Sequence, residues 1–187
     1  MGVIIPPEKP SYTWWMRLMI ASQKKKLGKP LQPILYWGRH PRAFFGFLWM
    51  LMAFNRKKSP LDKSWRALVR VHISQLLHCS FCIDMNMSDA IKLGLSQEKL
   101  EALSVYKNNP LYSDKEKLIL SYAEAVVHSD KTFGSECQRE LKKFLNDDAI
   151  IELTGLITHQ AMSAMFNSAL GIEPHGFCQT RGPHEQA

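Results

Sequence analysis

The chain has few of the features that mark secreted or membrane-spanning proteins. Its 187 residues include only four cysteines, and only Cys79 and Cys82 lie close together in sequence. This sparse set is not a secreted disulfide framework, and it suits a reducing compartment. Residues 1–10 lack the basic start and the apolar core of a signal peptide, so we expect a cytoplasmic protein.

Long apolar runs and strand patterns are also missing. The most apolar stretch, residues 43–54, has twelve residues, whereas a membrane-spanning helix needs about 20. No stretch shows the period-two alternation of a half-buried strand, and apolar residues recur instead at spacings of three and four. The sequence therefore predicts an all-α fold, a helical bundle.

Acidic residues are scarce in the first third of the chain. Residues 1–60 hold eleven Lys and Arg against one acid, while residues 61–187 hold thirteen against sixteen. The net charge of +7 therefore belongs to the N-terminal part, which argues against a nucleic-acid-binding core. We expect a basic, aromatic-rich extension at 1–58, a helical domain at 59–178 and an irregular tail at 179–187.

The N-terminal extension should contain two helices. The first runs from a cap at Thr13 to about Leu27, with two tryptophans near its start and three lysines near its end. Residues 14–29 could contact an anionic membrane peripherally, or their aromatic face could pack within the protein, which is the simpler interpretation. The second helix, 41–56, is hydrophobic all round, so both faces should be buried, one against another subunit of a homo-oligomer.

Six further helices are expected in the rest of the chain. They span about 61–78, 80–93, 97–106, 114–128, 136–145 and 147–170. Ser113 and Glu116 fit a capping box at the start of the fourth of these helices.

The residues most indicative of chemistry are Cys79 and Cys82, at positions i and i+3 of a helix start. The unpaired N–H groups and positive dipole end found there favour a thiolate, which is the reactive form of cysteine. A second thiol nearby lets oxidation stop at a reversible disulfide. The spacing therefore predicts a dithiol that handles hydroperoxides or disulfides, with a thiol protein or a small dithiol as its reductant.

Two other interpretations of the pair remain open. A metal site could use both cysteines with His72 and His78, but structural zinc usually takes two well-spaced ligand pairs, and no second CxxC occurs. We therefore expect no metal and no other cofactor. The remaining alternative is two small core side chains without chemistry, because cysteine is often buried.

The segment 68–96, LVRVHISQLLHCSFCIDMNMSDAIKLGLS, resembles the signature region of the alkyl hydroperoxidase D-like / carboxymuconolactone decarboxylase family. Similar landmarks follow at 122–125, 151–153, 166–167 and 170–178, so the resemblance spans roughly residues 60–178. It implies an all-helical subunit that forms dimers, trimers or hexamers. In the peroxidase branch it also implies a CxxC disulfide that cycles with a thiol donor.

The sequence departs from the family pattern at two positions. The family has a glutamate twelve residues before the first cysteine and a histidine four after the second, which form a proton relay to the thiols. Here these positions are Ala67 and Asn86. Asparagine cannot accept a proton near neutral pH, and losing general acid–base help typically costs about 10²–10⁴-fold in rate. The resemblance therefore extends to the two cysteines of the family pattern but not to its proton relay.

Other residues are candidates for a relay or a pocket beside the thiols, although each is more often structural. They are His72, Asn86, Glu124 and His159. Tyr122 and Asn167 are candidate hydrogen-bond donors, with packing as the simpler interpretation.

The leading prediction is a CxxC thiol oxidoreductase with weak or specialised peroxidase activity. We expect Cys82 to attack and Cys79 to resolve, because in the family the second cysteine lies nearest the relay. One alternative is a catalytically degenerate helical protein with a structural or redox-sensing role. Another is a lactone decarboxylase-like enzyme, against which the CxxC argues.

Overall fold

The computed structural model describes residues 12–178, and every regular element in this range is helical, which confirms the predicted all-α fold. The elements are α1 (Trp14–Leu27), α2 (Gln32–Trp37), α3 (Pro41–Phe54), α4 (Lys63–Leu76), α5 (Ser80–Lys92), α6 (Gln97–Glu101), the 3-10 helix η1 (Ala102–Asn108), α7 (Asp114–Val127), α8 (Lys131–Leu141) and α9 (Asp147–Ala169). The predicted tail at 179–187 lies outside the described residues.

Most helix positions agree with the pattern of apolar residues, and the exceptions have local causes. The short helix α2 was not predicted; it has a proline at its start and no side-chain cap. Helix α8 begins at Lys131, five residues earlier than expected, because the Asp130 side chain accepts the backbone N–H of Phe133 and caps it. The capping box of Ser113 and Glu116 is confirmed at the start of α7.

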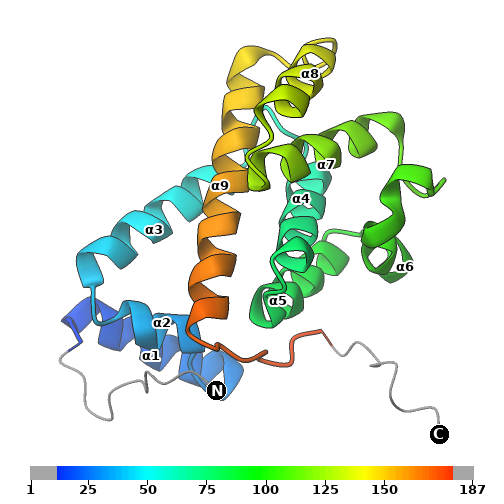
Figure 1. Ribbon diagram of the computed structural model, residues 1–187. Helices are drawn as coiled ribbons and strands as arrows, with labels where there is room; N and C mark the ends of the chain where they lie inside the picture. Colours follow the sequence, from blue (N-terminus) through cyan, green and yellow to red (C-terminus); the bar gives the residue numbers. More distant parts are fainter. Residues whose placement is uncertain (1–11, 179–187) are drawn as a thin grey trace, which may run out of the picture.

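The longest helix, α9, runs from beside α8 at one end of the molecule to α2 at the other (Figure 1). It packs with α4 and α7 around the largest apolar cluster, which includes Ile73, Tyr122 and Leu153. Burying such side chains contributes about 1.5–3 kcal/mol each. This three-helix core fixes α4, and α4 in turn carries the turn that holds the cysteine pair.

The N-terminal helices pack around a separate small cluster of Met16, Ile34 and Phe44. This cluster is joined to α9 by stacked rings, with centroids 4.2 Å apart for Trp37 and Phe166. At the first helix, Thr13 makes no side-chain cap hydrogen bond, contrary to expectation.

The two faces of α3 differ in burial within the single chain. One face packs toward α9 (Figure 1), where Gly155 leaves room for the ring of Phe54. The other face is open: Phe45, Trp49 and Met52 are 58%, 63% and 58% exposed. The subunit contact expected there stays a prediction. Within residues 12–178, no helix is both long enough and apolar enough to cross a bilayer.

Candidate active site

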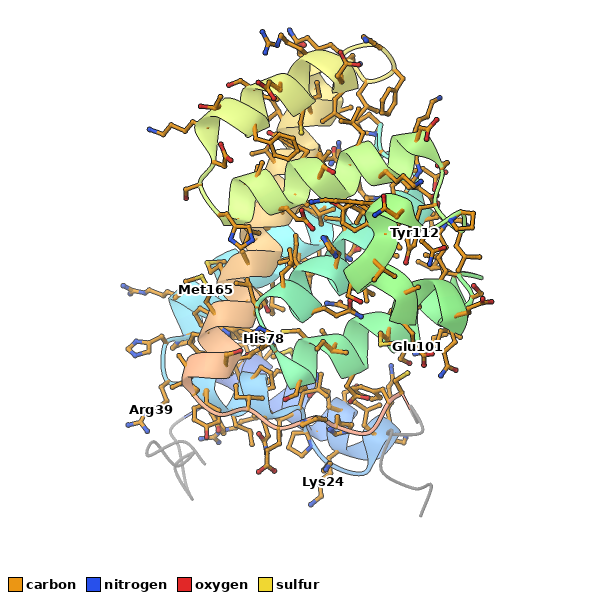
Figure 2. The ribbon with its side chains drawn as sticks, turned by 45° about the vertical axis from the view of Figure 1, so that its right-hand side comes forward. Lys24, Arg39, His78, Glu101, Tyr112 and Met165 are labelled. Atoms are coloured by element: carbon orange, nitrogen blue, oxygen red, sulfur yellow. The ribbon has the colours of Figure 1, made fainter. Side chains whose placement is uncertain are left out.

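The turn between α4 and α5 places the cysteine pair. Helix α4 ends in a Schellman motif, in which the N–H of His78 donates to the carbonyl of Gln75 at 3.1 Å and the N–H of Cys79 donates to the carbonyl of Ser74 at 3.0 Å. His78 has φ of 50°, a left-handed conformation that glycine usually occupies at this position. It lies beside the end of α9 that is closest to α2 (Figure 2). The chain therefore reverses tightly, and α5 starts one residue after Cys79.

Cys79 is the N-cap of α5. Its sulfur accepts the backbone N–H of Cys82 at 3.2 Å, in the way that a serine or aspartate oxygen does at most helix starts. A hydrogen bond from the Cys82 thiol lowers the pKa of Cys79 most, and the backbone N–H adds to this effect against the opposing effect of burial. The result is a pKa of about 7, which leaves much of Cys79 as thiolate at neutral pH.

The pKa of Cys82 moves in the opposite direction. Donating its hydrogen bond to Cys79 raises it, and burial and the negative charge on Cys79 raise it further. The side-chain amide of Asn167 donates to the sulfur of Cys82 at 3.3 Å. These two directions favour the thiolate on Cys79 and the proton on Cys82. The N-cap position of Cys79 favours the opposite order of attack to the one expected from the sequence.

Both sulfurs are enclosed, since Cys79 is 2% exposed and Cys82 is 0% exposed. The cover is mainly apolar and comes from α2 and its start, from the first turn of α5, from the end of α9 and from the segment after α9. Its members include Leu31, Tyr36, Phe81, Ala164, Phe166, Leu170 and Ile172. A substrate therefore reaches the sulfurs only when part of this cover moves.

The segment 170–178 is held in place by Asp84. The backbone N–H groups of residues 175–178 donate to its carboxylate at 2.7–3.1 Å, and this segment passes beneath α5 (Figure 1). Burial raises the pKa of Asp84, but the four donors outweigh burial and hold it below its usual value. Asp84 lies two residues after Cys82, so it anchors part of the cover directly beside the site.

The histidine and glutamate candidates for a relay make their polar contacts elsewhere. His72 Nε2 lies 3.3 Å from Glu124 Oε1, and Glu124 also pairs with Lys107 at 2.9 Å. They meet because α7 packs on α4 and α9, away from the cysteine turn. His159 Nε2 lies 3.2 Å from the carbonyl oxygen of Phe47 and joins α9 to α3. The structural interpretation of these three candidates fits their contacts, and a role beside the thiols stays a prediction.

Asn86 lies one helical turn after Cys82 and is also engaged. Its amide donates to Ser74 Oγ at 2.9 Å, and the amide of Gln160 donates to the same oxygen at 3.2 Å. Ser74 in turn donates to the carbonyl of Arg70 at 2.7 Å. Asn86 and Ala67 also line one large pocket, so both positions of the family relay border open space.

Three polar residues of α9 face the sulfurs. Asn167, which the sequence marked as a candidate donor, bonds Cys82, whereas Ser163 and Ser168 hydrogen-bond Cys82 and Cys79 respectively and were not predicted. Ser163 lies four residues before Asn167 and five before Ser168 on α9, and this spacing was the signal available in the sequence. Tyr122 is a packing residue, with its hydroxyl 2.7 Å from Thr154 Oγ1.

All four cysteines are free thiols. Within residues 12–178, no three His, Cys, Asp or Glu side chains are grouped closely enough to hold a metal ion. His78, one ligand of the metal alternative, is exposed to solvent.

Comparison with known proteins identifies the class. The model of the carboxymuconolactone decarboxylase family matches residues 39–125. The chain is 36% identical over 156 residues to the uncharacterized protein YnjA of Escherichia coli strain K12, an alignment that covers 83% of this chain and 86% of that protein. The chain belongs to the carboxymuconolactone decarboxylase family and has its alkyl hydroperoxidase D-like fold.

Solved structures show how widely this fold is used. An uncharacterized peroxidase-related protein from Ralstonia eutropha JMP134, with the alkylhydroperoxidase AhpD core, superposes with a TM-score of 0.75 at 18% identity over 92% of each chain. A variant of the debrominase Bmp8 in complex with 2,3,4-tribromopyrrole superposes with a TM-score of 0.73 at 18% identity, covering 94% of this chain and 95% of that one. At these identities the similarity establishes the fold alone.

Proposed function

We propose that this protein is a CxxC-dependent thiol oxidoreductase of antioxidant type, which reduces a hydroperoxide by cycling Cys79 and Cys82 between dithiol and disulfide. The observation that supports this most is the position of Cys79, whose sulfur accepts the N–H of Cys82 at 3.2 Å at the start of α5. A thiolate is the nucleophile in such chemistry, and this sulfur is the one stabilised as thiolate.

In the first step, the Cys79 thiolate attacks the terminal oxygen of the hydroperoxide ROOH and the O–O bond breaks. Cys79 becomes a sulfenic acid, and the leaving RO⁻ takes the proton of the Cys82 thiol to form ROH. In the second step, the Cys82 thiolate attacks the sulfur of Cys79, a disulfide forms, and hydroxide leaves and is protonated by solvent. An external dithiol then reduces the disulfide and becomes a disulfide itself.

This order of reaction steps explains how the site can work without the family's proton relay. The raised pKa of Cys82, caused by its hydrogen bond to Cys79 and by burial, keeps a proton beside the reacting sulfur until the O–O bond breaks. Asn167 holds Cys82 through its amide at 3.3 Å. Because a single proton carrier, the Cys82 thiol, replaces the Glu–His relay, we expect turnover to be slow rather than absent.

The decisive test is a peroxidase assay of the full chain with a dithiol reductant and cumene hydroperoxide. Cys79→Ser and Cys82→Ser should each lose nearly all activity, while the matched control Cys178→Ser should keep it, because Cys178 lies outside the pair and packs against another apolar cluster. Equal rates in all four proteins would remove the proposal.

The alternative is a catalytically degenerate protein. Restoring the relay with the double substitution Ala67→Glu and Asn86→His distinguishes it from the proposed enzyme. If the parent is inactive and the restored variant turns over, the protein is a family member that has lost catalysis. If the parent is active and depends on both cysteines, the alternative is excluded.

A second candidate is thiol-dependent dehalogenation of an aromatic ring. It is favoured by the mainly apolar cover of the sulfurs and by the fold shared with the debrominase Bmp8. The reaction would convert ArBr and the dithiol into ArH, the disulfide and HBr. Bromide release from 2,3,4-tribromopyrrole, dependent on Cys79, would support it, and the absence of release would exclude it.

A further inference from the structure

A large pocket opens on the far side of the α4–α5 hairpin from the cysteine turn. Its volume is about 1080 Å³, and its walls come from α4, α5, the 55–62 linker and Phe144 with Leu145. Ala67 and Asn86 both line it. It is therefore a cavity separate from the enclosure of the sulfurs, and the proposed function makes no use of it.

Two arginines of α4 line this pocket, and each has one buried nitrogen without a hydrogen-bond partner among the described residues. Arg66 Nη1 donates to the carbonyl of Phe54 at 2.7 Å, but its Nε is buried with no partner among the described residues. Arg70 Nη1 donates to Asn55 Oδ1 at 2.7 Å, and its Nη2 is likewise buried and unpaired. An unpaired buried donor of a charged group is unfavourable, so an added acceptor would stabilise each guanidinium.

The charge of the pocket is not balanced by its own carboxylates. Besides the arginines, three lysines line it, at positions 57, 63 and 92, against two acids. Asp62 already caps α4 through the N–H of Ser64 at 2.7 Å, and Asp89 already pairs with Lys92 at 3.3 Å. Burial, followed by the charge of Arg66, lowers the pKa of Arg70 to about 10, and the charge of Asp89 offsets this only in part.

The pocket also has apolar walls, supplied by Leu61, Trp65, Leu93, Phe144 and Leu145. An inorganic ion alone would leave these side chains in contact with water. A ligand with an apolar body and one anionic end would match both parts, because specific pockets combine apolar walls with a few placed polar groups.

We propose that this pocket binds an organic anion, with its carboxylate or phosphate oxygens on Arg66 and Arg70 and its apolar body against Trp65 and Phe144. Arginine presents a planar fork that suits either oxygen group. Ala67 is essential to the site, because a glutamate at that position, as in the family pattern, would place a carboxylate between the arginines and occupy the space. The departure that removes the relay thus opens the pocket.

The test is isothermal titration calorimetry of the full chain with benzoate and, in a separate arm, phenyl phosphate; benzamide serves as the uncharged control of similar shape. Arg70→Met removes one anion contact, and Ala67→Glu fills the pocket with a competing carboxylate. Arg139→Met removes the same charge from the exposed face of α8. Circular dichroism melting confirms that each variant is folded.

We expect at least one anion to bind, benzamide not to bind, and Arg70→Met to weaken binding by about tenfold or more, in line with a charge-assisted contact. Ala67→Glu should abolish binding and Arg139→Met should leave it unchanged. The tighter of the two anions identifies the head group. Equal binding of benzamide, an unchanged affinity in Ala67→Glu, or no heat from either anion at millimolar concentration would overturn the proposal. Ala67→Glu keeps the test decisive if Arg70→Met does not fold.

Discussion

The pKa of Cys79 should depend on the thiol of Cys82, and Cys82→Ala tests this directly. The hydrogen bond from Cys82 is the largest cause of the lowered pKa, and the variant removes it while keeping the backbone N–H donor. The lowered pKa, about 7 against a usual 9.0, favours the thiolate of Cys79 at neutral pH. A full return to the usual value would leave about 1% of Cys79 as thiolate at pH 7.

Because Cys82→Ala keeps the backbone N–H donor, we expect the pKa of Cys79 to rise by less than a full return to the usual value. We predict that alkylation of Cys79 by iodoacetamide at pH 7, measured by peptide mass spectrometry between pH 5 and 10, slows by about tenfold in Cys82→Ala. In the wild type the rate should rise with pH through an inflection near 7, because a thiol with a lowered pKa loses its thiolate only as the pH falls through that value.

Two results would refute this reasoning. One is an inflection for Cys79 at or above that of an ordinary thiol in the wild type. The other is Cys82 reacting first across the whole pH range, which would restore the order expected from the sequence. Cys137→Ala is the matched control, because Cys137 is equally buried at 3% exposed and lies in another apolar cluster.

Three further predictions follow from other contacts. Asp84→Asn weakens the anchor of residues 175–178, so the free energy of unfolding in urea should fall by about 1–3 kcal/mol, and alkylation of Cys79 should accelerate as the cover loosens; no change in either would show that the anchor is unimportant. Asn167→Ala should slow peroxide turnover more than it lowers the melting temperature, since it removes the donor to Cys82; a fall in melting temperature alone would mark Asn167 as structural. Trp49→Asp should reduce the mass measured by light scattering, if the exposed face of α3 joins subunits; an unchanged mass would exclude that face.

The helices were largely predictable because their signals are local. Apolar spacing located α4, α5, α7 and α9, and the capping box fixed the start of α7. Helix α2 has six residues and no side-chain cap, so it carries no comparable signal. What covers the exposed face of α3 could not be identified from the sequence either, because apolar content does not reveal the partner of a surface.

The site was predictable only in part. The CxxC spacing pointed to the pair that the fold encloses, but which of the two sulfurs caps α5 depends on the turn at His78. Residues such as His72 and Glu124 find partners through helix packing, which a single sequence does not specify. The anchor at Asp84 was missed because its donors are backbone N–H groups from residues 175–178, and these leave no mark in side-chain identity.

The central claim is that Cys79 and Cys82 cycle together, and disulfide mapping after one equivalent of hydroperoxide tests it most directly. Reduced full-length protein is mixed with cumene hydroperoxide, quenched with iodoacetamide and analysed by mass spectrometry. We expect loss of two hydrogens and a single Cys79–Cys82 disulfide, with one cumyl alcohol formed per chain. Both thiols remaining alkylatable while the hydroperoxide persists would contradict it.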